Sequence, residues 1–249
     1  MARHTDSARA AYDRMAPHYD AFTAHHDYDG WTRTLERLAR RHGLRGRRLL
    51  DVGCGTGKSF HPFLRRGYDV VACDVSPAMA ARARARAPGV PVHVCDVRAL
   101  PRLGRFDLVC CLDDCLNHLL DADALALAVA RMAANLAPGG VLVFDLNTLA
   151  TYRSFFAQEL AVGALRWRGR TAPDAPPGVL AHAELIAGAP PIAHVQRHHP
   201  EPVARAALAA AGLRCAAVYG HGLDGVPHEA LDDLVDTKAV YIARREERR

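Results

Sequence analysis

Glycines alternate with other residues in a short stretch that directly follows an apolar run. It reads Asp51, Val52, Gly53, Cys54, Gly55, Thr56 and Gly57. Glycine lets the backbone turn tightly and lets a ligand approach it closely. Two common phosphate-binding patterns do not fit, because the phosphate loop requires glycine in place of Val52 and the dinucleotide fingerprint requires glycine in place of Lys58. The stretch predicts a ligand-binding turn that does not cradle a pyrophosphate.

Two further carboxylates end the next two predicted strands. Asp74 ends a strand over 68–74, and Asp96 follows a strand over 92–95. Because the carboxyl ends of parallel strands share one edge of a sheet, both acids are expected beside the glycine turn. Asp74 can accept hydrogen bonds from both hydroxyls of a ribose, and Asp96 can face an adenine amino group. The pattern predicts an adenosine pocket; the alternative is that Asp74 and Asp96 merely begin turns.

These motifs resemble those of class I S-adenosylmethionine-dependent methyltransferases over residues 48–146. The resemblance rests on 51–57, 74–79, 95–97 and 136–140. It implies an S-adenosylmethionine cofactor and an α/β, Rossmann-like, doubly wound seven-stranded sheet whose last strand is antiparallel. It also implies that Asp74 binds the ribose, that Met79 packs on adenine and that Asp96 and Val97 bind the adenine edge. The predicted cofactor-binding residues are Tyr19, Asp51, Gly53, Cys54, Gly55, Gly57, Asp74, Val75, Met79, Asp96, Val97 and Leu112.

Two tyrosines precede the predicted sheet. Tyr12 and Tyr19 are seven residues apart, so they share one face of a helix predicted over 7–22. An amphipathic surface pair would show the same spacing. The repeat also resembles the N-terminal lid of small-molecule methyltransferases, which implies that Tyr12 and Tyr19 close over the cofactor and the acceptor.

A polar segment follows the fourth predicted strand, over 106–112. It contains Asp113, Asp114, Asn117 and His118. Its position at the sheet edge makes it the expected floor of a reaction site. The segment resembles that of sugar N,N-dimethyltransferases of antibiotic pathways, in which a histidine precedes a leucine. His118 is predicted as a general base or acceptor-orienting group; the alternative is a histidine that only hydrogen-bonds to the backbone.

The same segment raises the question of a metal. Asp113, Asp114 and His118 could contribute to a metal-assisted O-methyltransferase site, but no further oxygen-rich ligand cluster is apparent. No metal is therefore predicted.

Segments at 22–31, 144–152, 197–201 and 237–241 resemble actinobacterial natural-product methyltransferases, such as those of lincosamide pathways, which N-methylate a proline-derived ring. The resemblance implies methyl transfer to a small-molecule acceptor in antibiotic or secondary-metabolite biosynthesis, with N-methylation favoured. The predicted catalytic residues are His118, Tyr12 and Tyr19. The predicted acceptor-binding residues are Tyr12, Phe22, His26, Trp31, Asn117, His118, Asn147 and Tyr152.

Several alternatives remain open at this point. O-methylation of a small-molecule hydroxyl is one. An RNA or protein methyltransferase is another, although the segment after the fourth strand lacks the Asn-Pro-Pro-Tyr type of sequence often found where nucleic-acid amino groups are methylated. A non-catalytic S-adenosylmethionine-binding partner is the third. Of His198 and His199, at most one is expected to face the acceptor, because adjacent strand residues point in opposite directions.

Alternating strands and helices must position these residues. Helices are predicted over 7–22, 28–42, 58–66, 77–87, 125–136 and 201–211, and core strands over 48–52, 68–74, 92–95, 106–112, 141–146, 213–219 and 238–244. Antiparallel strands are predicted over 178–186 and 192–198. The predicted divisions are a helical lid (1–45), a cofactor-binding core (46–160), inserted antiparallel strands over the acceptor site (161–200) and the C-terminal part of the core sheet (201–249).

Composition limits the class of protein. The 249 residues are 50% apolar, which suits one α/β domain with an insertion. The net charge of +5 comes with arginine clusters but few interleaved aromatics, so nucleic acid is not an expected partner. Seven cysteines, four of them in apolar strand-like runs, indicate a reducing compartment. With no apolar signal core or membrane-length run, we expect a cytoplasmic protein and no membrane partner. The sequence leaves a homo-oligomer open.

Overall fold

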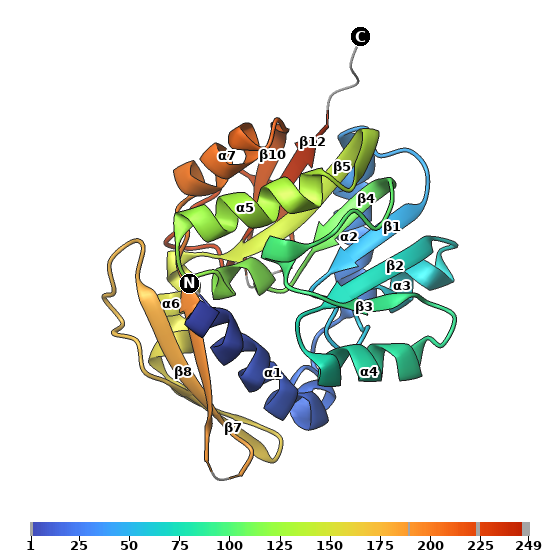
Figure 1. Ribbon diagram of the computed structural model, residues 1–249. Helices are drawn as coiled ribbons and strands as arrows, with labels where there is room; N and C mark the ends of the chain where they lie inside the picture. The colour runs from blue at the N-terminus through green and yellow to red at the C-terminus, as the bar shows by residue number, and fades with distance from the viewer. Residues whose placement is uncertain (1, 189, 223–224, 246–249) are drawn as a thin grey trace.

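The computed structural model describes residues 2–188, 190–222 and 225–245. A mixed sheet of eight strands lies at its centre, with helices packed on both faces (Figure 1). The strand order is β11-β10-β12-β5-β4-β1-β2-β3. The strands span Arg48–Val52 (β1), Asp69–Asp74 (β2), Val92–Val94 (β3), Phe106–Cys111 (β4), Leu136–Asn147 (β5), Arg214–His221 (β10), Pro227–Glu229 (β11) and Lys238–Arg244 (β12).

The strand directions agree with the Rossmann-like prediction. β3, β2, β1, β4 and β5 pair in parallel, and β12 runs antiparallel to β5 and β10. The predicted α/β sheet with an antiparallel last strand is therefore confirmed. One strand is added to the seven predicted, because the three-residue β11 pairs with the outer edge of β10.

Successive strand residues face opposite layers of helices. Leu49 belongs to the hydrophobic cluster on one face and Leu50 to the cluster on the other. This double burial explains why the strands are continuously apolar rather than alternating. One face is covered by α5 (Ala122–Ala133) and α7 (Glu201–Ala210), and the other by α2 (Tyr28–Arg41), α3 (His61–Arg65) and α4 (Pro77–Arg86).

Capping residues decide where the helices begin. Ser76 accepts a hydrogen bond from the Met79 N–H and Pro77 occupies the first turn, so α4 begins as predicted. α5 begins three residues before the predicted 125, because the Asp121 side chain accepts the Ala124 N–H. The helix predicted over 58–66 is only α3, since the chain turns through Gly57 at φ +85° before it becomes helical.

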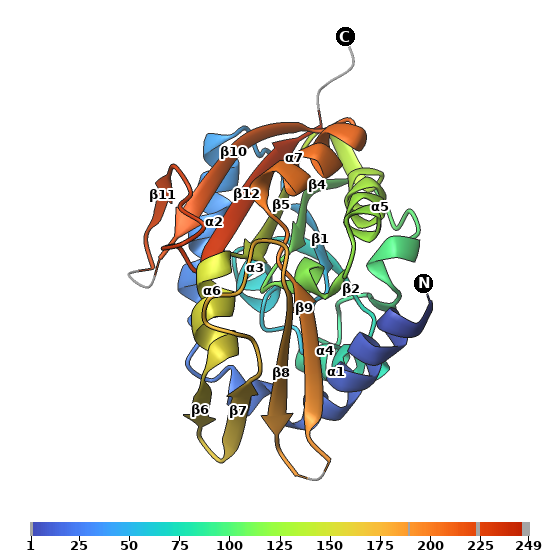
Figure 2. The same cartoon turned by 90° about the vertical axis from the view of Figure 1, so that its left-hand side faces the viewer.

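A second, antiparallel sheet lies beside the first helix. Its strands β6 (Glu159–Val162), β7 (Leu165–Gly169), β8 (Leu180–Ile186) and β9 (Ile192–Arg197) pair in sequence order. The predicted antiparallel insertion is confirmed, with β6 and β7 in addition to the two strands predicted. In Figure 2 these strands extend below the central sheet next to α1 (Ala2–Phe22), and α1 contacts β9 and α4.

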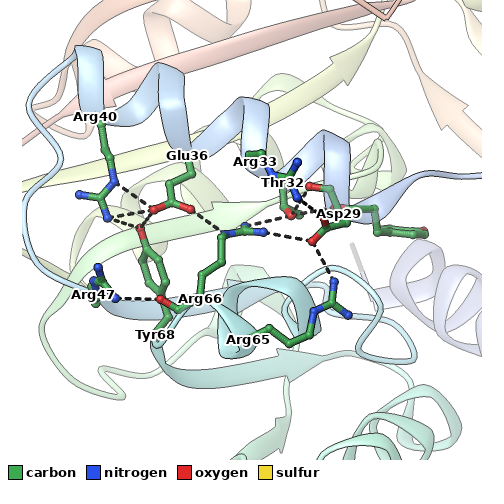
Figure 3. A network of polar contacts seen from close by, with 10 residues as sticks. Asp29, Thr32, Arg33, Glu36, Arg40, Arg47, Arg65, Arg66 and Tyr68 are labelled. Carbon is green, nitrogen blue, oxygen red and sulfur yellow. Dashed lines mark hydrogen bonds and ion pairs between the residues drawn. The ribbon is translucent and has the colours of Figure 1, made fainter.

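A polar network holds α2 against the chain that enters β2 (Figure 3). Arg66 donates to Glu36 Oε2 at 2.8 Å and to Thr32 Oγ1 at 3.0 Å, and Tyr68 donates to Glu36 Oε1 at 2.8 Å. Burial raises the pKa of Glu36, but hydrogen bonds from Tyr68 and Arg40 outweigh it and hold the pKa below its usual value. The network thereby fixes α2, whose first residue, Tyr28, lines the cavity described below.

No helix within the described ranges is long and apolar enough to cross a membrane.

Candidate active site

A cavity of about 350 Å³ lies between α1 and the carboxyl ends of the parallel strands. The glycine turn after β1, the ends of β2 and β3 and the segment after β4 all contribute to its wall. The following predicted site residues line it: Tyr12, Tyr19, Gly53, Cys54, Gly55, Asp74, Val75, Asp96, Val97, Leu112 and His118. The expectation that strand-end residues gather at one edge of the sheet therefore holds for the glycine turn, for Asp74 and Asp96, and for the segment after β4.

The glycine turn requires its glycines. Gly53 and Gly55 have φ values of +71° and +53°, in the left-handed region that favours glycine. A Cβ at Gly53 would overlap Cys115 Sγ, and one at Gly55 would lie 3.6 Å from the Tyr19 ring. Gly57 does not line the cavity; a Cβ there would lie 2.7 Å from the Phe60 ring. The turn thus presents bare backbone to the cavity, with Tyr19 above it.

Asp74 is tied to this turn. Its Oδ2 accepts the Gly55 N–H at 2.8 Å and its Oδ1 accepts the Ser76 N–H at 2.8 Å. Burial raises the pKa of Asp74 to about 6 in spite of these hydrogen bonds. Each carboxylate oxygen keeps acceptor capacity for one more donor, which suits the paired hydroxyls of a ribose.

Asp96 lies farther along the same wall. It forms an ion pair with Arg98 at 2.7 Å and caps the short helix η1 (Val97–Ala99) by accepting the Arg98 N–H at 2.9 Å. Arg98 also lines the cavity and was not predicted from the sequence. The contact between Asp96 and an adenine amino group stays a prediction.

Two predicted cofactor residues support the wall without lining it. Asp51 lies beneath the turn, accepts a hydrogen bond from Ser59 Oγ at 2.5 Å, and has its pKa raised to about 7 by burial. Met79 is fully buried in a cluster with Met15 of α1 and Leu185 of β8. Their predicted contacts with the cofactor remain predictions.

Tyr12 and His118 form a hydrogen-bonded pair on the cavity wall. The Tyr12 hydroxyl lies 2.9 Å from His118 Nε2, and His118 Nδ1 lies 3.2 Å from the Val195 carbonyl oxygen. A carbonyl oxygen only accepts, so Nδ1 carries the proton and Nε2 accepts from Tyr12. Burial lowers the pKa of His118, while burial raises that of Tyr12. Both groups are therefore neutral near pH 7.

The segment after β4 is held in a strained conformation. Asp113 and Asp114 have φ values of 57° and 54°, and their N–H groups each donate to the buried Asp145 at 2.8 Å. Lys238 pairs with Asp145 at 2.9 Å. Positive φ at a non-glycine residue costs about 1–3 kcal/mol, which these contacts must offset. Asp113, whose pKa burial raises to about 6, lines the cavity as a result.

Some predicted acceptor residues lie outside the cavity wall. Phe22 packs against Trp167, with ring centroids 5.9 Å apart. Trp31 on α2 lies edge-on to His221, with centroids 4.7 Å apart. His26 lies beside Tyr28, with ring centroids 5.9 Å apart. Their contacts with an acceptor stay predictions.

The other three predicted acceptor residues, Asn117, Asn147 and Tyr152, form hydrogen bonds with β9 of the second sheet. Asn117 donates to the Arg197 carbonyl at 2.9 Å and accepts the Asn147 N–H at 3.0 Å. Asn147 and Tyr152 both donate to Gln196 Oε1, at 3.0 and 3.1 Å. These residues connect the central sheet to the second sheet. Their predicted contacts with the acceptor also remain predictions.

The two adjacent histidines after β9 have other partners. His198 pairs with Asp233 at 3.1 Å, and His199 bonds to the Leu119 carbonyl at 2.7 Å. Neither lines the cavity.

Residues of β9 that hold His118 were missed at the sequence level. Ile192, His194 and Gln196 alternate on the buried side of the strand. Polar residues on the buried face of an alternating strand are unusual, and this pattern is the signal in the sequence that could have identified His194 and Gln196.

Within the described residues, no group of three or more histidine, cysteine, aspartate or glutamate side chains is placed to hold a metal ion.

Comparison with known proteins decides the family. A family model described as a methyltransferase domain matches residues 49–140. A demethylmenaquinone methyltransferase of Renibacterium salmoninarum is 32% identical over 183 residues, which are 70% of this chain and 75% of the relative. The chain belongs to the S-adenosylmethionine-dependent methyltransferases.

This methyltransferase is also similar to two proteins that act on amino sugars. The dTDP-4-amino-2,3,4,6-tetradeoxy-D-glucose N,N-dimethyltransferase of Saccharopolyspora spinosa is 32% identical over 151 residues, 58% of this chain and 61% of the relative. A solved structure of an amino pentose methyltransferase from Micromonospora echinaspora, involved in calicheamicin biosynthesis and bound to S-adenosylmethionine, is 27% identical. It has a TM-score of 0.64 and covers 88% of this chain and 92% of its own. The predicted resemblance to sugar N-methyltransferases is confirmed.

The match to curated relatives is partial. Four of them, the Saccharopolyspora enzyme included, align over 47% to 61% of their own length.

Proposed function

We propose that this methyltransferase transfers the methyl group of S-adenosylmethionine to the amine nitrogen of a small-molecule acceptor, an amino-sugar-like or lincosamide-like amine of secondary metabolism. The observation that carries the proposal is a single cavity. Its wall includes the glycine turn with Asp74 and also the Tyr12–His118 pair. The likeness to two amino-sugar methyltransferases supports an amine as the acceptor.

The residues present fit the cofactor. Gly53 and Gly55 leave bare backbone where any side chain would collide or be strained, and Asp74 offers two carboxylate oxygens next to them. In this proposal Asp74 holds the ribose, the glycine turn holds the methionine end, and Asp96 and Val97 hold adenine. When bound, S-adenosylmethionine supplies a methyl group on a positively charged sulfur, which makes that carbon electrophilic.

The chain must then prepare the acceptor. An amine attacks through its lone pair, so it has to be unprotonated and its extra proton has to leave. His118 Nε2 is unprotonated because burial lowers the pKa of His118, and it can accept that proton through the Tyr12 hydroxyl, which passes its own proton to Nε2 and takes up the acceptor's proton. α1 carries Tyr12 and Tyr19 over the cavity and limits water. Orientation of this kind contributes about 7–11 kcal/mol in favourable cases.

A methyl-transfer assay tests the proposal. Labelled S-adenosylmethionine is offered with a nucleotide-linked amino sugar, with the same sugar bearing a hydroxyl in place of the amine, and with transfer RNA. We expect label in the amino sugar alone. Transfer to the hydroxyl sugar would overturn N-methylation in favour of O-methylation, and transfer to RNA would overturn the small-molecule acceptor.

The His118→Ala variant tests the base. Loss of a general base lowers turnover by about 100-fold or more, while cofactor affinity measured by calorimetry stays unchanged. His182→Ala, at an exposed position of β8, is the matched control and is expected to keep full turnover. Wild-type turnover in His118→Ala would remove His118 from the reaction.

A further inference from the structure

Gln196 reaches from the second sheet to the segment that carries His118. It lies on β9, is only 3% exposed, and has a partner for each part of its side-chain amide. Its Nε2 donates to Asp114 Oδ2 at 2.6 Å and lies 3.3 Å from His118 Nε2. Its Oε1 accepts from Asn147 Nδ2 at 3.0 Å and from the Tyr152 hydroxyl at 3.1 Å.

These partners allow only one orientation of the amide. Asn147 Nδ2 and the Tyr152 hydroxyl face Oε1 as donors, whereas the Asp114 carboxylate faces Nε2 as an acceptor. A flipped amide would set its oxygen against the Asp114 carboxylate and its NH₂ against the NH₂ of Asn147. The second N–H of Nε2 is therefore directed at His118.

The same strand also holds the other nitrogen of His118. Val195 accepts the Nδ1 proton through its carbonyl, so Nε2 is left with a lone pair that faces the Tyr12 hydroxyl and the Gln196 amide. We propose that Gln196 is a positioning residue that keeps Nε2 of His118 unprotonated and separates it from the carboxylate of Asp114. That an unprotonated Nε2 matters for turnover rests on the proposed function, in which His118 accepts the proton of the amine.

The charges around His118 explain why such a separation matters. The titratable groups that face it are Tyr12 of α1, His194 of β9 and Asp114 after β4. Burial keeps Tyr12 and His194 neutral, since it raises the pKa of Tyr12 and lowers that of His194 to about 3. The carboxylate of Asp114, whose Oδ1 lies 3.9 Å from Lys238 Nζ, acts in the opposite direction to burial and raises the pKa of His118.

Gln196 opposes this influence in two ways. Its amide occupies the place from which Asp114 could accept a proton from a charged His118 ring. Its N–H also meets the Nε2 lone pair and would face the added proton if Nε2 became protonated. Both effects favour the neutral ring that a proton acceptor needs.

The test measures His118 itself by NMR of histidine-labelled protein, with its signals assigned by their absence from His118→Ala. In the wild type we expect the Nδ1–H tautomer and a titration midpoint below the usual histidine value. Gln196→Glu places a carboxylate against Nε2, so the midpoint should rise by about one pH unit or more. Gln196→Met removes the donor without adding charge and should raise the midpoint by a smaller amount. Gln158→Glu makes the same change at an exposed position and should leave it unmoved.

The outcomes separate this inference from the proposed function. An unmoved His118 midpoint in folded Gln196→Glu, or in Gln196→Met if the glutamate variant does not fold, would overturn the positioning role. If the midpoint rises, the acid side of the turnover profile should move to higher pH with it, and cofactor affinity should stay unchanged. A midpoint that rises while the turnover profile stays in place supports the role of Gln196 and contradicts His118 as the base.

Discussion

Each carboxylate oxygen of Asp74 accepts one backbone N–H, from Gly55 or from Ser76. A single side chain thus joins the glycine turn to the N-cap residue of α4 while it remains on the cavity wall. This double attachment fixes the carboxylate before any ligand arrives, so little side-chain entropy remains to be lost on binding.

Replacement of Asp74 by alanine should weaken cofactor binding by about 10- to 100-fold, because hydrogen bonds to a charged group contribute about 1.5–3 kcal/mol. Calorimetry with S-adenosylmethionine measures the change. Asp69→Ala, at the exposed first residue of the same strand, is the control and should bind as the wild type does. Wild-type affinity in Asp74→Ala would contradict the ribose role.

Among the elements, α1 borders the cavity and is attached to three other parts of the molecule. Asp13 accepts from Ser76 Oγ at 2.5 Å, Asp20 accepts from Thr56 Oγ1 at 2.6 Å, and Arg14 donates to the carbonyls of Pro190 and Pro191. The helix is therefore attached to α4, to the glycine turn and to the β8–β9 hairpin. These contacts make it a cover over the cavity that both sheets hold in place.

Asp20→Ala should loosen this cover at the glycine turn. It removes the Thr56 hydrogen bond and a partly exposed ion pair with Arg86 at 2.6 Å, so we expect cofactor dissociation about fivefold faster, equivalent to ~1 kcal/mol. Stopped-flow displacement measures this rate. Asp174→Ala, in an exposed turn of the second sheet, should not alter it. An unchanged rate in Asp20→Ala would show that α1 does not retain the cofactor.

At the scale of the whole molecule, buried titratable groups act on stability in opposite directions. Burial raises the pKa of Asp51 to about 7, whereas it lowers that of His194 to about 3. Between pH 4 and 7 folded Asp51 holds a proton that the unfolded chain has lost, so its contribution to the free energy of unfolding falls as pH rises. His194 contributes stability above its usual pKa that is lost as pH falls.

Asp51→Asn isolates the first effect. The asparagine has no proton to lose, so the variant should gain stability relative to the wild type as pH rises from 5 to 7. Urea unfolding at several pH values gives both curves, and Asp69→Asn serves as the control. Parallel curves for Asp51→Asn and wild type would contradict the raised pKa of Asp51.

Local and periodic signals predicted much of this molecule. The cap at Ser76, the apolar strands and the strand-end acids depend on neighbours in sequence or on the general geometry of parallel sheets, and they led to the cavity. Gln196 lies on a strand of the second sheet, whereas His118 lies in the segment after β4 of the central sheet, 78 residues away. The alternation in β9 shows which residues are buried but not which segment they meet. Trp31 illustrates the same limit, because the resemblance assigned it to the acceptor and nothing in the sequence showed that its ring lies against His221.

The ion pair between Lys238 and Asp145 has a consequence for the order of assembly on the ribosome. Strands β1, β2 and β4 and the glycine turn emerge long before Lys238, which begins β12. Until β12 enters the sheet beside β5, Asp145 lacks its cation, and an uncompensated buried charge is strongly unfavourable. A nascent chain can therefore pair β1, β2 and β4 early, while Asp145 can hold the segment after β4 in its folded conformation only after residue 238 has been added.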